Sequence, residues 1–161
     1  MFTTGYVIAM VGIALCVLLC GVGSSIGLFR TGSAAAGVLS ENPKLFGKVM
    51  VLVLLPATQG IYGFIIAIIA SGQLTTITNA IEAVEGAGGM AAQGWAIFAA
   101  CMPMAISGFF SAFFQAKAAV NCIYAAAKQD SLGFKIAMGP AMIEFYALLG
   151  LVISILVILA I

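Results

Sequence analysis

Four long stretches of the chain carry at most one charge, and this pattern constrains the fold more than any other feature. They cover about residues 6–29, 49–70, 95–116 and 136–160, and the last contains one acid, Glu144. Each is close to or above the length of about 20 apolar residues that a helix needs to cross a bilayer. Charged residues make up 7% of the chain, whereas soluble domains have about 25%. The sequence therefore predicts an all-α integral membrane protein with four transmembrane helices.

The charges between these spans predict an orientation. All 6 basic residues fall between the first and second spans or between the third and fourth: Arg30, Lys44, Lys48, Lys117, Lys128 and Lys135. The middle connection carries only Glu82 and Glu85. Because positive charge marks the cytoplasmic side, we expect both basic turns to be cytoplasmic and both termini to lie outside.

The two halves of the chain repeat each other. A shift of 87 residues places Lys117 on Arg30. The same shift superposes small and apolar residues of the two halves: Gly108 on Gly21, Ser111 on Ser24, Gly150 on Gly63 and Ile153 on Ile66. We expect two fused helical hairpins of the same orientation, with the first hairpin at 1–74, an external connection at 75–91 and the second hairpin at 92–161. Glu144 falls on Ala57, so one carboxylate serves four helices.

Small residues form stripes on the first and third spans. Gly23 and Gly27 stand four residues apart, and Gly108, Ala112 and Ala116 repeat that spacing. Such stripes let helices approach closely in lipid. They indicate either ordinary packing within one chain or the inner wall of a ring of chains, and equivalent faces on both hairpins favour the ring.

Glu144 is the one charge inside a predicted span, where a charged side chain costs about 2.5–3.5 kcal/mol at the bilayer centre. Counted along a helix at roughly 1.5 Å per residue, Gln115 and Glu144 both lie about 22 Å from the turn expected at residues 129–130. Gln59 lies about 25 Å from the matching turn at residues 42–43. We therefore expect the three side chains to share one membrane level.

The second span brings further polar groups to this level. Leu55, Thr58, Gln59 and Tyr62 form a single helical stripe. Pro56 lacks a backbone donor, so it should disturb its turn and leave a carbonyl oxygen available. With the acid, this stripe offers only oxygen ligands, which suit hard cations, and one carboxylate balances one monovalent ion, Na⁺ or H⁺. The alternative is a glutamate that only holds helices together.

The segments LLPATQGIYGF, FSAFFQAKAA and MIEFYALLG, set in doubled hairpins, resemble the rotor-ring proteolipid (the K or c component) of V-type ATPases, most closely its bacterial sodium-transporting branch. The resemblance covers Val7 to Ile161. It implies a homo-oligomeric ring in lipid, turned by ATP hydrolysis in a soluble head, with no catalysis by this chain alone. The implied partners are a stator membrane subunit with half-channels and central-stalk subunits on the cytoplasmic face. The implied location is the bacterial plasma membrane.

The resemblance also implies roles for single residues. Glu144 would be the ion-binding carboxylate. Oxygen ligands and a hydrogen bond to the carboxylate would come from five others: Gln115, Gln59, the Thr58 hydroxyl, the Leu55 backbone carbonyl and, for the hydrogen bond, Tyr62. A proton rotor needs only the acid, so the whole set favours Na⁺ over the alternative, H⁺. Ala57 stands where the family has glycine and Phe145 where it has threonine.

Other classes of protein fit less well. A small four-helix proton-coupled antiporter would carry its glutamate in the first span, among aromatic residues around a drug cavity. An enzyme is disfavoured because the chain has no histidine and no visible nucleophile–base pair, and a net charge of +1 offers no basic surface for nucleic acid. The cysteines lack metal-binding spacing and are interpreted as packing residues: Cys16, Cys20, Cys101 and Cys122.

Overall fold

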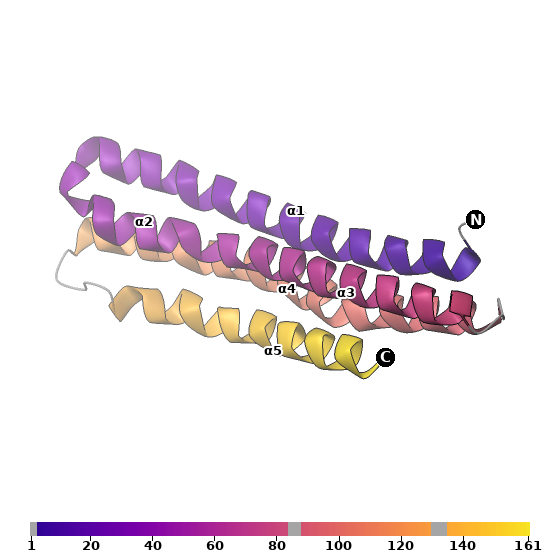
Figure 1. Cartoon of the computed structure of the whole chain (residues 1–161). Coiled ribbons are helices and arrows are strands. Elements are labelled where there is room, and N and C mark those ends of the chain that lie inside the picture. Colours follow the sequence, from indigo (N-terminus) through magenta and orange to yellow (C-terminus); the bar gives the residue numbers. More distant parts are fainter. Residues whose placement is uncertain (1–2, 84–87, 130–134) are drawn as a thin grey trace.

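The computed structural model describes residues 3–83, 88–129 and 135–161, and its long helices run side by side in one bundle (Figure 1). The helical elements are α1 (Thr4–Glu41), the 3₁₀-helix η1 (Pro43–Leu45), α2 (Phe46–Leu54), the 3₁₀-helix η2 (Leu55–Ala57), α3 (Thr58–Ala83), α4 (Gly88–Lys128) and α5 (Met138–Ala160). Within the described ranges, four helical segments are long and apolar enough to cross a membrane. The predicted four-helix, all-α membrane fold is confirmed.

The helices are longer than the lipid-soluble stretches that the sequence marks. α1 continues past Arg30 to Glu41, and α4 continues past Lys117 to Lys128. Charge does not end a helix, and residues 31–41 stay helical because Ala34, Ala35 and Val38 are buried against α2 and α4, since packing supplies most helix stability in proteins.

The structure agrees with one expected connection between spans and differs from another. The turn expected at residues 42–43 is confirmed, because Asn42 ends α1 and Pro43 begins η1. The external connection expected at 75–91 is largely helical, since α3 extends to Ala83 and α4 begins at Gly88. Glu85, Asp130 and the side chain of Glu82 lie outside the described residues.

The two hairpins repeat the same internal contact. α1 packs along α4, α3 packs on α1, and α5 packs on α4 (Figure 1). A Cβ atom built on Gly63 of α3 would lie 2.5 Å from Cβ of Cys20 on α1. One built on Gly150 of α5 would lie 2.9 Å from Cβ of Ser107 on α4. Both glycines therefore let the second helix of a hairpin touch the first helix, and the two glycines lie 87 residues apart in the sequence.

The small-residue stripes pack inside the chain. A Cβ atom on Gly23 would lie 3.0 Å from the Phe109 carbonyl oxygen and 3.3 Å from Cβ of Ala112. Cys16 and Cys20 are fully buried beside them, in keeping with the interpretation as packing residues. These contacts establish close packing of α1 on α4 within one chain, and they are compatible with the inner wall of a ring.

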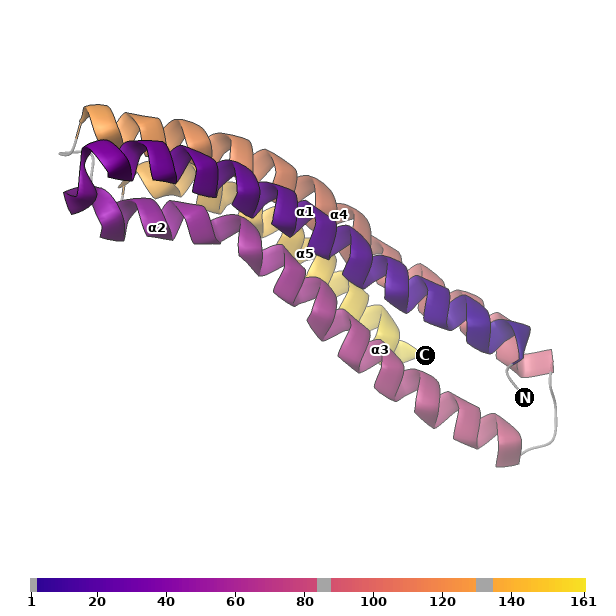
Figure 2. The same ribbon diagram turned by 90° about the horizontal axis from the view of Figure 1, so that it is seen from above.

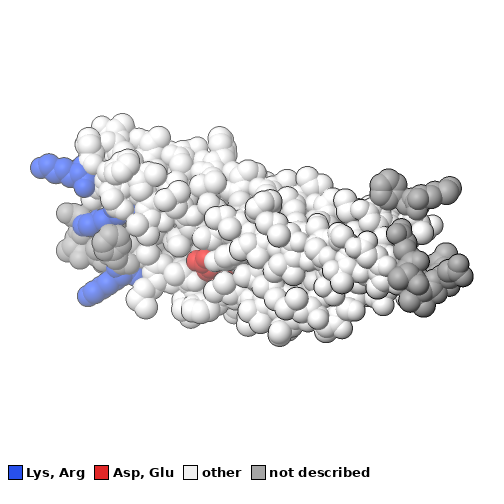
Figure 3. All heavy atoms as spheres, in the orientation of Figure 1, with Lys and Arg blue, Asp and Glu red and all other residues white. Residues whose placement is uncertain are grey.

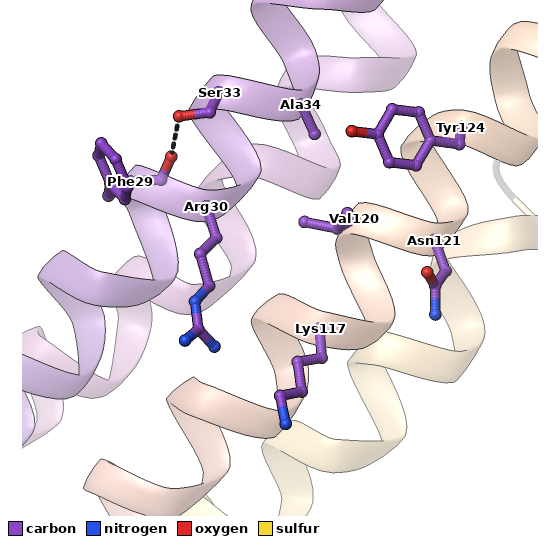
Figure 4. Close-up of a pocket in the computed structure, with 8 residues that line it drawn as sticks. All are labelled: Phe29, Arg30, Ser33, Ala34, Lys117, Val120, Asn121 and Tyr124. Atoms are coloured by element: carbon purple, nitrogen blue, oxygen red, sulfur yellow. Dashed lines mark hydrogen bonds between the residues drawn. The ribbon is translucent and has the colours of Figure 1, made fainter.

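The basic residues gather at one end of the bundle. The lysine and arginine side chains visible in Figure 3 lie at the end where α1 passes into η1. Arg30 of α1 and Lys117 of α4 line a pocket of about 670 Å³ and extend in the same direction along it (Figure 4). Both lie over the Phe113 ring, with the guanidinium carbon 4.3 Å and Nζ 4.6 Å from its centre, a cation–π arrangement.

Candidate ion-binding site

A break in the second membrane-crossing helix builds the site. α2 ends at Leu54, and α3 begins in a new direction after η2 (Figure 2). Pro56 has no N–H group, so it cannot continue the α-helical ladder. The Thr58 N–H instead bonds the Leu55 carbonyl three residues back. The predicted disturbance at Pro56 is confirmed, and it sets Thr58 and Gln59 at the start of a new helix.

Two buried glutamines link three helices next to this break. Nε2 of Gln59 donates to Oε1 of Gln115 at 2.7 Å. Nε2 of Gln115 donates in turn to the Pro140 carbonyl at 3.1 Å, one helical turn before Glu144 on α5. Neither glutamine side chain has any solvent-exposed surface. These bonds join α3, α4 and α5 at the membrane level that the sequence predicted.

One oxygen of this network is left over. Oε1 of Gln59 is buried and accepts no hydrogen bond from any residue that the structure describes. A buried polar atom without a partner costs about 1–3 kcal/mol, and such exceptions need a physical explanation. An oxygen in this state, in a network that reaches α5 one helical turn before Glu144, fits a ligand that the protein atoms alone do not supply.

Glu144 lies on the side of the bundle and is hydrogen-bonded by a residue of α3. The Tyr62 hydroxyl donates to Oε1 of Glu144 at 2.7 Å, which is the bond that the family resemblance implied. Glu144 is half-buried, whereas its neighbours Phe145 and Tyr146 are exposed. The carboxylate is therefore bonded to α3 and flanked along α5 by exposed aromatic side chains.

Thr58 and Leu55 form a compact turn around the break. The Thr58 hydroxyl donates to the Leu55 carbonyl at 2.9 Å, and the same carbonyl accepts the Thr58 N–H. The Leu55 carbonyl, which the family resemblance implied as an ion ligand, therefore accepts two hydrogen bonds from Thr58 in this structure. The Thr58 oxygen keeps its own lone pairs, because a hydroxyl that donates its proton can still accept.

Two contacts of the site were not foreseen from the sequence. One is the bond from Gln115 to the Pro140 carbonyl. The other is the bond from the Gly60 N–H to Oγ of Ser24 on α1, at 2.7 Å. The internal repeat pairs Ser24 with Ser111, but nothing in the sequence indicated that the Ser24 hydroxyl reaches the second span.

Fold and site together define a class: a multi-pass membrane protein of two repeated hairpins, with a carboxylate in its last membrane-crossing helix and a network of buried amides that reaches the same helix. The family model that describes the C subunit of ATP synthase matches the chain twice, over residues 11–70 and 98–157. The two matches are offset by the same 87 residues as the internal repeat. The chain therefore belongs to the ATP synthase C subunit family, the rotor-ring proteolipids, and the resemblance seen in the sequence is confirmed.

Three relatives illustrate this membership. The chain is 37% identical over 155 residues to the V-type sodium ATPase subunit K of Enterococcus hirae, covering 96% of this chain and 92% of that protein. It is 34% identical over 155 residues to the A-type ATP synthase subunit K of Methanocaldococcus jannaschii, covering 96% and 63%. It is 41% identical over 76 residues to the c'' subunit of the V-type proton ATPase of Saccharomyces cerevisiae, covering 47% and 36%. The names of these relatives include both sodium and proton.

Proposed function

We propose that this chain is a Na⁺-carrying subunit of the membrane rotor ring of a V/A-type ATPase, with one ion held by Glu144 in each chain. The observation that carries the proposal is the buried, unbonded Oε1 of Gln59, next to Gln115 and to the helix that bears Glu144. The 37% identity to a sodium ATPase subunit K supports the choice of ion.

The donor set fits a monovalent cation. It comprises oxygen atoms only: one carboxylate oxygen of Glu144, Oε1 of Gln59 and of Gln115, Oγ1 of Thr58 and the Leu55 carbonyl. Tyr62 bonds one carboxylate oxygen and leaves the other for the ion. The Leu55 carbonyl joins when the Thr58 proton rotates away from it. One negative charge against one Na⁺ gives a neutral site, whereas Ca²⁺ would leave a net charge and needs about six to eight oxygen ligands.

Neutrality is what lets the site pass through lipid. A charged carboxylate on an apolar flank is costly in hydrocarbon, and an ion-occupied Glu144 removes that charge. In the ring, each chain would take its ion from one half-channel of a stator subunit and release it to the other. ATP hydrolysis would occur in the soluble head, reached through central-stalk subunits, so this chain is a carrier and not a catalyst.

The proposed orientation follows from the charge distribution. The end of the bundle that carries the lysines and arginines (Figure 3) would face the cytoplasm, by the positive-inside rule. Both termini and the α3–α4 connection would then lie outside, in a bacterial plasma membrane.

Carbodiimide labelling tests the ion. These reagents modify protonated carboxyl groups in apolar surroundings, so they should label Glu144 and block ATP-driven transport. Na⁺ should protect the carboxylate, since an ion-occupied Glu144 is not protonated, and protection should weaken as the pH falls and protons compete. Labelling that is indifferent to Na⁺ at every pH would favour the alternative, a proton-only rotor that uses the same acid.

A further inference from the structure

One face of α1 lies directly against the break between α2 and α3. Three buried residues, spaced i, i+3 and i+7, form this face. We call them the break-facing stripe: Ser24, Gly27 and Thr31. None of them belongs to the proposed ligand set, yet each meets a different part of the broken helix.

Ser24 acts as the N-cap that α3 lacks. The N–H groups in the first turn of a helix have no acceptor within it, and a Ser, Thr, Asp or Asn side chain just before the helix usually supplies one. The residues before α3 are Leu55, Pro56 and Ala57, which carry no side-chain acceptor. Oγ of Ser24 accepts the Gly60 N–H at 2.7 Å instead, from another helix.

A glycine makes this approach possible. A Cβ atom on Gly60 would lie 3.1 Å from Oγ of Ser24 and 3.3 Å from its Cβ. A side chain at Gly60 would therefore require Ser24 or α3 to shift by a few tenths of an ångström. Because Gly60 follows Gln59 directly, this cap fixes the backbone that carries the unbonded amide oxygen.

The other two residues of the break-facing stripe, Gly27 and Thr31, contact Pro56 and the residues before it. A Cβ atom on Gly27 would lie 2.6 Å from Cβ of Pro56, so only glycine lets the proline ring seat on α1. The Thr31 hydroxyl lies 3.2 Å from the Val53 carbonyl, which precedes Pro56. It also lies within reach of the Gly27 and Leu28 carbonyls of its own helix. The stripe thus accepts a hydrogen bond after the break and places a hydroxyl donor within reach of the carbonyl before it.

The duplicated half provides an internal comparison. A shift of 87 residues places the stripe at Ser111, Phe114 and Ala118 of α4 and places Ile143 at Pro56. α5 runs without a break from Met138 to Ala160. Among the residues that the structure describes, the Ser111 hydroxyl bonds within its own helix, to the Gly108 carbonyl. The stripe and the break therefore occur together in one half and are both missing from the other.

We propose that Ser24 and Thr31 are positioning residues of the ion site. With Gly27 they fix the geometry of the break and so orient the oxygens of Leu55, Thr58 and Gln59 toward the ion, without touching it. This inference rests on the proposed function. It predicts a loss of Na⁺ affinity without a matching loss of carboxyl reactivity, because protonation of Glu144 does not require an ordered break.

The first test uses purified, assembled rings of the Ser24→Ala variant. The measured quantities are the Na⁺ concentration that half-protects Glu144 from carbodiimide at fixed pH, and the labelling rate without Na⁺. The half-protecting concentration should rise about three- to tenfold, the size expected for loss of one N-cap, while the Na⁺-free rate stays unchanged. The matched control is Ser111→Ala, which removes an equally buried hydroxyl from the equivalent position and should change neither quantity.

A second pair of variants tests the same role if the Ser24→Ala ring does not assemble. Thr31→Val keeps the shape of the side chain and removes its hydroxyl, so Na⁺ protection should weaken. Thr31→Ser restores the hydroxyl and should restore protection. Unchanged protection in both Ser24→Ala and Thr31→Val, or a parallel change in the Na⁺-free rate, would overturn the positioning role. If the parent ring itself shows no protection by Na⁺, the proposed function fails and this inference fails with it.

Discussion

Replacement of Gln115 by leucine is the sharpest separation of ligand from scaffold. Gln115 is fully buried, accepts from Nε2 of Gln59 and donates to the Pro140 carbonyl. Leucine keeps roughly the same bulk and removes both bonds. The Gln59 amide then loses its one hydrogen-bonded partner, and the site loses an oxygen that the proposal assigns to the ion.

The expected loss follows from these contacts. Removing a buried polar partner of a charged group costs about 1.4–2.7 kcal/mol, which lowers Na⁺ affinity roughly 10–100-fold. Ring assembly should survive, because α4 meets α1 through other residues. Gly108 packs against Cys20, and Ala112 packs against Gly23, so the small-residue contact that lets these helices approach is untouched.

Equilibrium binding of ²²Na⁺ to the purified ring measures the affinity, and migration of an SDS-resistant oligomer reports assembly. Glu144 in Gln115→Leu should also be labelled by carbodiimide at Na⁺ concentrations that protect the parent. Lys117→Gln is the control, because Lys117 is exposed two positions away, over the Phe113 ring, and should leave binding nearly unchanged. An intact Gln115→Leu ring with the parent's affinity would remove α4 from the site.

Two further predictions concern stoichiometry and orientation. Equilibrium binding should give one Na⁺ per chain, since only the second hairpin carries the acid, and two ions per chain would refute this. In a Cys122→Ser background, cysteines at Asn42 and Gln129 should react with impermeant reagents from the cytoplasm. A cysteine at Asn79, exposed near the end of α3, should react only from outside; the reverse pattern would contradict the orientation.

Much of the site follows from the sequence for a simple physical reason. The two arms of a helical hairpin rise equally from their turn, so residues equidistant from it lie side by side. This is why Gln115 and the turn of α5 around Glu144 could be paired by counting. Gln59 could be added from the first hairpin because the two turns share one membrane face. The position of the turn in each hairpin is the only information that this count requires.

The partners that cross between helices could not be predicted in this way. Ser24 and Thr31 lie on the same stripe as Gly27, and a sequence shows only that such a stripe is small enough for close packing. Whether its hydroxyls bond their own helix or a neighbouring backbone depends on where that neighbour breaks. The bonds to the Leu55 carbonyl were not foreseen for a related reason, because Thr58 supplies a local donor to it.

The structural difference between the two halves gives a reason for the single ion site that we propose in each chain. Backbone that leaves the helical ladder is tolerated at membrane depth only where protein covers it. The break at Pro56 meets this condition, because Pro56 is buried and packs on α1. The carboxylate needs the opposite setting, an intact helix on an exposed flank, which α5 provides. The first half has Ala57 where the second has Glu144 and Leu28 where it has Gln115, so it carries neither the acid nor the equivalent amide of a second site.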